Sequence, residues 1–212
     1  MADWDANSPQ LEVNLRQVLS NVKEHATQRS LLTLNTIREW HRQVMSGLDV
    51  PNRDHIGAFR GEPRVQGINV GVGTVVGVVS SEVLNELRIF NTTLQKVIGR
   101  LDELVPSGAI PNEDAAAAVL ELCGWAHAEW VRIHPFVNGN GRTARLLANY
   151  LAMRYRLPLF VRLRPRPDGN YAAVAAMAMR GIWEPTSMYF AELYLQQLKR
   201  QRTDKLVITS GR

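Results

Sequence analysis

HPFVNGNGRTAR, residues 134–145, is the stretch of this 212-residue chain on which the interpretation of the rest depends. It lies between two segments of helical periodicity, and a Gly-Asn-Gly turn at 139–141 opens the second of them. The first amides of a helix lack intrahelical partners and lie at the positive end of its dipole, so this turn predicts an anion site. Arg142 and Arg145 are three residues apart and share one helix face, where both guanidinium groups can reach one polyphosphate.

His134 comes directly before this turn and titrates near neutral pH, which suits a general base acting on a hydroxyl group. We expect Phe136 to anchor the turn in the hydrophobic core. Taken singly, such features are usually structural, because histidines before prolines, helical arginines and glycine turns are common. Together within twelve residues, a base, an anion site and two phosphate-binding side chains favour nucleotidyl or phosphoryl transfer.

The rest of the chain is mostly helical by its apolar periodicity. The segments with helical spacing are about 11–22, 34–45, 79–104, 111–133, 140–156, 170–181 and 185–203. Ser80 and Ser81 are candidate caps for the third of these helices. Residues 56–78 instead mix β-branched residues with glycines, which predicts a hairpin or an extended flap. The sequence thus predicts one mostly helical domain with a small β element.

The net charge of +5 comes from 25 Lys and Arg residues against 20 Asp and Glu residues. All but four of the basic residues are arginines, whose planar donors suit phosphate and carboxylate groups. A nucleic-acid surface, a phosphate-binding active site and the codon bias of a GC-rich genome each account for this excess, and composition does not choose among them. The segment RLRPRP at 162–167 is the part of the sequence that most favours nucleic-acid binding.

The sequence also carries information on where the protein acts. Cys123 is the single cysteine, so a disulfide framework and a Cys-based zinc cluster are excluded. No stretch approaches the roughly 18 apolar residues of a membrane span, and the N-terminus lacks the features of a classical secretory signal. We therefore expect a cytoplasmic protein without a membrane partner. Delivery into another cell by a non-classical route and assembly into a homo-oligomer stay open.

The stretch at 134–145 resembles the motif of the Fic (filamentation induced by cAMP) family, His-x-Phe-x-Asp/Glu-Gly-Asn-Gly-Arg-x-x-Arg. The matching positions are His134, Phe136, Gly139, Asn140, Gly141, Arg142 and Arg145. WHRQVMSGL at 40–48 and HIGAFRGEPRVQGINV at 55–70 are similar to a helix and the target-docking flap of the family. DGNYAAVAAM at 168–177 is similar to the helix beside the family's adenine pocket, so the resemblance covers roughly residues 31–200.

From this resemblance we expect a mainly α Fic fold, a helical bundle with a small β-hairpin flap, at residues 31–205 after a candidate regulatory segment at 1–30. The resemblance implies a protein adenylyltransferase, a nucleotidyltransferase that moves AMP from ATP to a Ser, Thr or Tyr hydroxyl of a target protein. The target is expected to dock at the flap, about residues 59–70, by strand-like pairing. ATP is the implied substrate, and Mg²⁺ accompanies it.

The resemblance also implies a role for each matching residue. His134 deprotonates the target hydroxyl, and Tyr171 with Asn170 borders the adenine. The implied phosphate-binding groups are the amides of Gly139, Asn140 and Gly141, the side chain of Arg142, and Arg145 at the γ-phosphate.

Asn138 departs from the family pattern, because it stands where an Asp or Glu usually binds Mg²⁺. Its amide oxygen can ligate a hard cation but brings no negative charge, so we expect weakened metal binding through the ATP phosphates. Three outcomes stay open: a slow AMP transferase, a transferase with a different nucleotide or phosphorylated donor, and a module that binds nucleotide with little turnover.

Glu24 is a candidate inhibitory residue by the same resemblance. The spacing from Ser20 to Glu24 matches the family's inhibitory helix, whose glutamate pairs with the second motif arginine, although His25 replaces the usual Gly or Asn. An ordinary exposed helix glutamate is the alternative. A basic helical module that binds nucleic acid explains the net charge but not the order of residues in the motif, so we expect no nucleic-acid partner.

Overall fold

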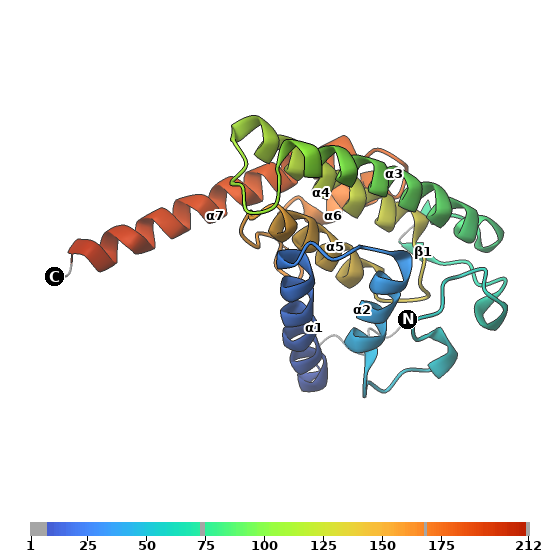
Figure 1. The fold of residues 1–212 in the computed structure, drawn as a ribbon. Helices are drawn as coiled ribbons and strands as arrows, with labels where there is room; N and C mark the ends of the chain where they lie inside the picture. Colours follow the sequence, from blue (N-terminus) through green and yellow to red (C-terminus); the bar gives the residue numbers. More distant parts are fainter. Residues whose placement is uncertain (1–7, 73–74, 168, 211–212) are drawn as a thin grey trace.

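Helices make up most of the part of the chain that the computed structural model describes, residues 8–72, 75–167 and 169–210, with 202–210 described by their backbone alone. In these residues the helices are α1 (Pro9–Thr27), α2 (Leu34–Met45), α3 (Val83–Leu104), α4 (Glu113–Ile133), α5 (Asn140–Arg154), α6 (Tyr171–Ala178) and α7 (Glu184–Ser210). Short strands β1 (Gly71–Val72) and β2 (Val75–Val76) pair antiparallel, and 3-10 turns lie at Arg53–His55, Pro63–Val65 and Ser80–Glu82. The expected mainly α fold with a small β-hairpin is confirmed (Figure 1).

α4 is the central helix and packs against α3, α5, α6 and α7. Asn112 caps its start by accepting a hydrogen bond from the Ala115 amide at 2.9 Å, and two acidic residues occupy its first turn, at the positive end of its dipole. Gly124 allows the close approach of α7, since a Cβ there would lie 2.4 Å from the Cα of Ser187. The C-terminal end of this enclosed helix leads directly into the turn before α5.

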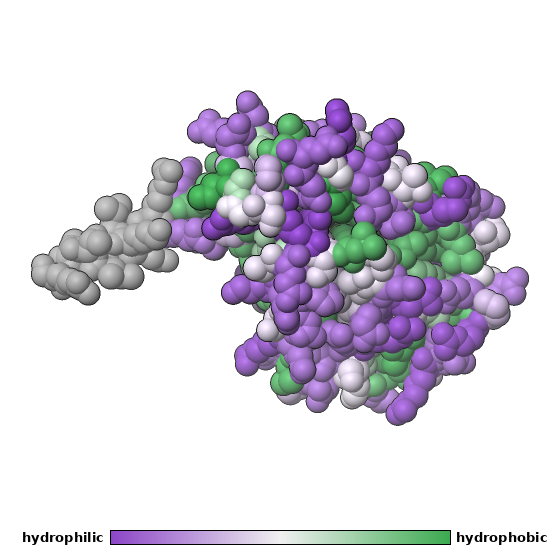
Figure 2. Space-filling view, in the orientation of Figure 1, coloured by the Kyte–Doolittle hydropathy of each residue, from purple (hydrophilic) through white to green (hydrophobic). Residues whose placement is uncertain are grey.

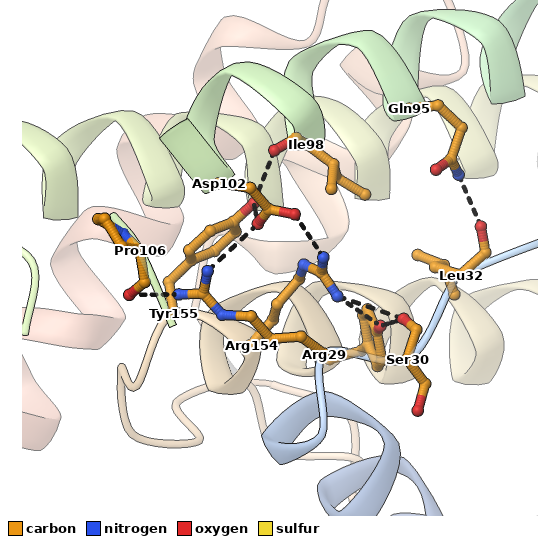
Figure 3. A network of polar contacts seen from close by, with 10 residues as sticks. Arg29, Ser30, Leu32, Gln95, Ile98, Asp102, Pro106, Arg154 and Tyr155 are labelled. Atoms are coloured by element: carbon orange, nitrogen blue, oxygen red, sulfur yellow. Dashed lines mark hydrogen bonds and ion pairs between the residues drawn. The ribbon is translucent and has the colours of Figure 1, made fainter. Parts of the chain in front are cut away.

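α1 is part of the same hydrophobic core as the other helices, since it packs against α2 and α5. Its buried hydrophobic residues are Leu11, Leu15, Val18, Val22 and Ala26. The polar contacts in Figure 3 join the end of α1 to the bundle: Arg29 and Arg154 both pair with Asp102 of α3, at 3.5 Å and 2.6 Å. The Tyr155 hydroxyl donates to the same carboxylate at 2.9 Å. Residues on both sides of position 30 therefore share one core.

The start of α3 differs from the sequence prediction. The Ser80-Ser81 cap was wrong, because the helix begins at Val83 after a 3-10 turn and its N-cap residue, Glu82, makes no side-chain capping bond. The Ser80 hydroxyl instead accepts from the amide of Gly67 at 3.2 Å. A contact across the flap has displaced the local capping pattern.

The surface view in Figure 2 is largely hydrophilic, with hydrophobic residues in separate small areas. Among the described helices, none is both long enough and apolar enough to span a bilayer.

Candidate active site

The residues between α4 and α5 form a tight turn held by one asparagine side chain. His134 follows α4 with φ 53°, and Gly139 precedes α5 with φ 80°, both in the left-handed region. The Nδ2 of Asn140 donates to the carbonyl of Phe136, and its Oδ1 accepts from the Phe136 amide, both at 2.8 Å. Phe136 is fully buried, which confirms it as the anchor of the turn. The motif asparagine thus fixes the backbone with its side chain as well as supplying an amide.

His134 is oriented by the helix end that precedes it. Its Nδ1 lies 3.1 Å from the carbonyl oxygen of Val131, so we assign the proton to Nδ1 and leave Nε2 as the basic nitrogen. Burial lowers the pKa of His134, the hydrogen bond to Val131 raises it, and the positive charge of Arg60 lowers it again. The net direction is downward, so the imidazole is neutral at pH 7 and able to accept a proton.

The first amides of α5 lie where the sequence predicts an anion site. The first helical hydrogen bonds run from the Arg142 and Thr143 amides to the carbonyl of Gly139, at 3.1 Å and 3.0 Å. The amides of Asn140 and Gly141 precede these bonds and lack an intrahelical partner. The Gly139 amide, by contrast, donates to the side chain of the residue before it.

Glycine is favoured at position 139 by its positive φ, and the neighbouring side chains leave little room for a larger residue. A Cβ there would lie 2.6 Å from the Cε of Met45 and 3.1 Å from the Nε2 of His41. Both neighbouring groups belong to α2, so α2 packs against the turn.

Arg145 is buried, with 7% of its surface exposed. Its Nη1 donates to the hydroxyl of Tyr171 at 3.0 Å, and its Nη2 donates to the carbonyl of Leu163 at 3.1 Å. The Nε2 of His127 lies 3.0 Å from the same hydroxyl. Burial and the charge of Arg145 lower the pKa of His127 to about 3, so this histidine stays neutral. A buried chain of polar groups therefore links α4, α5 and α6.

The two residues expected at the adenine are adjacent in sequence but face different surroundings. Tyr171 is 5% exposed and contacts Arg145 and His127. Asn170 lines a pocket of about 430 Å³ between the α5–α6 connection and α7, together with Arg162 and Tyr189.

The residues at position 138 and around it do not fit a resident Mg²⁺ site. The Oδ1 of Asn138 accepts from the Gly139 amide and lies 3.3 Å from Nη2 of Arg142, so the oxygen expected to bind the metal is neutral and contacts a cation. Among the described residues, no group of three or more His, Cys, Asp or Glu side chains could hold a metal ion. Mg²⁺ is therefore treated as part of the ATP substrate.

Glu24 lies on the exposed side of α1, and its carboxylate accepts from the Nε2 of Gln28 at 3.2 Å. Since Arg145 bonds to Tyr171 and Leu163, the structure does not bring Glu24 and Arg145 together.

The sequence analysis missed a histidine and an arginine that organise the site. His41 of α2 stacks on Phe136 with ring centroids 3.8 Å apart, and its Nε2 lies 3.0 Å from the main-chain oxygen of Asn138. Its Nδ1 accepts from the amide of Gly57 at 2.9 Å, and burial lowers its pKa to about 4. Arg60 is fully buried between the flap and the turn. The sequence offered one signal for each residue. His41 is a polar residue at an apolar position of a helical pattern, and Arg60 directly follows the core residue Phe59.

Comparisons with known proteins agree with the motif. The sequence model of the Fic/DOC family matches residues 31–152. Protein adenylyltransferase Fic of Drosophila virilis is 64% identical over 67 residues, 32% of this chain and 14% of that protein. Protein adenylyltransferase fic-1 of Caenorhabditis elegans is 29% identical over 161 residues, 76% of this chain and 27% of that protein. The chain thus spans a minor part of the length of the curated relatives it matches.

Solved structures share the fold. A Fic domain containing signaling protein from Bacteroides thetaiotaomicron gives a TM-score of 0.67 at 20% identity and covers 90% of this chain and 69% of that one. Fic-1 from C. elegans, residues 134–508, gives a TM-score of 0.62 at 22% identity, with 96% and 54% of the two chains covered.

Proposed function

Because this chain belongs to the Fic/DOC family, we propose that it is a protein adenylyltransferase, which transfers AMP from ATP to a Ser, Thr or Tyr hydroxyl of a target protein. One observation carries the proposal. A neutral histidine whose Nε2 is the basic nitrogen lies in the turn before a helix N-terminus, whose first amides and Arg142 are proposed to hold the phosphates. Relatives named protein adenylyltransferase support the same activity.

The reaction is a displacement at the α-phosphate of ATP. His134 takes the proton of the target hydroxyl through Nε2, and the hydroxyl oxygen attacks the α-phosphorus. The bond from that phosphorus to the bridging oxygen of the β-phosphate breaks, and pyrophosphate leaves. The amides of Asn140 and Gly141, the α5 dipole and Arg142 stabilise the negative charge on the phosphates.

Arg145 keeps donors for a γ-phosphate beside the bonds it already makes. Its described bonds go to the Tyr171 hydroxyl and the Leu163 carbonyl, which use two of its five N–H groups, and its buried Nε has no hydrogen-bond partner among the described residues. We propose that Arg145 binds the γ-phosphate through its remaining N–H groups and that Tyr171 packs against the adenine. Asn170 is proposed to contact the nucleotide from the neighbouring pocket.

The residue at position 138 makes slow turnover the expected behaviour. A neutral amide contributes less than a carboxylate to holding Mg²⁺ with ATP. A different nucleotide or phosphorylated donor, or nucleotide binding with little turnover, is the second candidate, and it rests on this same residue.

The target protein is proposed to pair with the flap, by which we mean the predicted residues 59–70 together with the β1–β2 hairpin and Gly77–Val78 that follow them. The outward side chains of the hairpin are half-exposed, with Val72 at 51% and Val76 at 60%. An extended target segment can add to such an edge through main-chain hydrogen bonds that tolerate varied side chains. We propose the cytoplasm, where ATP is abundant, as the place of this reaction.

The test uses two labels of ATP. Protein is incubated with lysate and with ATP labelled at either the α- or the γ-phosphate, using wild type, His134→Ala and, as matched control, His25→Ala on the exposed face of α1. We expect His134-dependent label from the α-position alone, lost by a factor of about 10²–10⁴ in His134→Ala and retained in His25→Ala. His134-dependent label from the γ-position would indicate phosphoryl transfer, and the absence of any His134-dependent label would contradict both.

A further inference from the structure

Arg60 is a buried cation that is held by main-chain carbonyls. None of its surface is exposed, and it forms no ion pair with any carboxylate of the described residues. Four hydrogen bonds from its guanidinium group go to carbonyl oxygens of four different residues. A buried charge without such partners is costly, so these bonds specify its environment closely.

Two of the four bonds hold the end of α4. The Nε of Arg60 donates to the carbonyl of His134 at 2.7 Å, and Nη2 donates to the carbonyl of Ile133 at 2.9 Å. The Arg60 amide adds a bond to the carbonyl of Pro135 at 2.7 Å. The negative end of the α4 dipole also favours a cation at this place. Arg60 thus fixes the backbone of the residue that presents the base.

The other two bonds hold the flap on both sides of its hairpin. Nη1 donates to the carbonyl of Ile68 at 3.2 Å, before β1, and Nη2 donates to the carbonyl of Val78 at 2.8 Å, after β2. Gly77 lies between the hairpin and this contact, and a Cβ on it would lie 3.0 Å from the Cβ of His134. The segment that follows β2 therefore passes directly against His134.

We propose that Arg60 is the positioning residue that couples the flap to His134, so that a target segment paired with the flap is placed at a fixed distance from the base. The inference rests on the proposed role of His134. One guanidinium group donates to the flap before β1 and after β2 and also to the carbonyl of His134. A shift of the flap therefore shifts the base with it. Lysine cannot replace it, because an ammonium group has three donors and no planar fork, while Arg60 makes four bonds.

The charge of Arg60 acts on the pKa of His134, an effect that packing contacts alone would not produce. It lowers the pKa of His134 in addition to the effect of burial. Arg60→Gln removes this charge and is expected to raise that pKa, whereas Arg60→Lys keeps the charge and loses the fork.

Arg38→Gln is the matched control. Arg38 donates to Glu62 on the same loop and lies over the ring of Phe59, with its Cζ 4.3 Å from the ring centroid. Its described contacts do not reach the turn before α5. It therefore reports the effect of losing an arginine of α2 that contacts the same loop without the coupling.

The experiment measures two quantities that need no catalytic turnover, in wild type and the three variants. One is the pKa of His134 from NMR of labelled histidines, assigned with His134→Ala. The other is amide hydrogen exchange of residues 66–78 and 134–141. Arg60→Gln is expected to raise the pKa and to speed exchange about tenfold or more in both segments. Arg60→Lys should speed exchange in both and leave the pKa near the wild-type value, and Arg38→Gln should change neither.

Faster exchange confined to residues 58–62, with an unchanged His134 pKa in Arg60→Gln, would overturn the proposal. If Arg60→Gln does not fold, Arg60→Lys decides it: exchange unchanged in either segment overturns the coupling. Both quantities can be measured even if the wild-type protein transfers no AMP. The coupling by Arg60 and the proposed function can therefore fail separately.

Discussion

Two buried arginines of α5, one toward each end of the helix, donate to hydrogen-bond acceptors of different charge. At the N-terminal end, Arg145 donates to a tyrosine hydroxyl and to a main-chain carbonyl, both neutral. At the C-terminal end, Arg154 pairs with the carboxylate of Asp102 at 2.6 Å, in the network of Figure 3. Both arginines are 7% exposed, so burial does not distinguish them.

On the proposed function, one residue type serves phosphate binding at the N-terminal end and stability at the C-terminal end. Neutral acceptors leave the positive charge of the arginine and of the helix N-terminus available to a polyphosphate. A carboxylate in the same place would compete with the phosphate. At the C-terminal end the carboxylate neutralises the arginine and connects α5 to α3. Arg60 follows the pattern of the N-terminal end, since main-chain carbonyls rather than a carboxylate hold it.

The sharpest test of this comparison removes one arginine from each end. At the N-terminal end the substituted residue is Arg142, which is proposed to contact the phosphates as Arg145 does. Arg142→Gln is expected to lower kcat/KM for AMP transfer about 100-fold, because the lost interaction forms with the phosphates. Arg154→Gln is expected to lower the free energy of unfolding by about 1–3 kcal/mol, a range that allows for the 33% exposure of Asp102, and to leave the activity of the folded protein unchanged.

Steady-state kinetics and urea unfolding of both variants check these expectations. If Arg154→Gln lost activity without losing stability, or if Arg142→Gln did the reverse, the assignment of the two ends would be wrong.

A smaller effect is expected from Asn138→Asp. The carboxylate adds a charged oxygen for Mg²⁺ beside the ATP phosphates, so the Mg²⁺ concentration for half-maximal rate should fall by about tenfold. Asn138→Ala is the paired control, since it removes the oxygen altogether. The reading of position 138 fails if Asn138→Asp changes neither the metal dependence nor the rate of transfer.

The smallest effect is expected at Glu24. Its carboxylate is exposed and bonds Gln28, so Glu24→Gln should leave the rate of self-modification unchanged. Glu24→Gly should lower the stability of α1 by about 0.5–1 kcal/mol through helix propensity and likewise leave the rate unchanged. A clear rise in rate in both variants would instead make Glu24 inhibitory and would require Arg145 to leave its present partners.

The helices and the turn were predictable because their signals are local. Apolar spacing located the helices, although the predicted ends of α1 and α7 fall five and seven residues short of the observed ones at Thr27 and Ser210. The motif placed His134 and the α5 amides by sequence order alone. The predicted Ser80-Ser81 cap of α3 was wrong because a distant contact competed with it: the Ser80 hydroxyl bonds to the flap.

The two residues that organise the site, His41 and Arg60, were not predictable, because their contacts are distant in sequence. His41 and Arg60 act through main-chain oxygens that are 97 and 74 residues away in sequence, and a carbonyl leaves no mark on the sequence. The opposite surroundings of Asn170 and Tyr171 also depend on how α6 packs rather than on residue type.

The pH dependence of AMP transfer tests the central claim, that a neutral His134, in the turn between α4 and α5, is the base. Because the pKa of His134 is lowered from 6.5, the rate should rise with pH, reach half its maximum below pH 6.5 and be flat between pH 7 and 8. The rise should be absent in His134→Ala. A rate that still climbs through pH 8, or a profile unchanged in His134→Ala, would contradict the account.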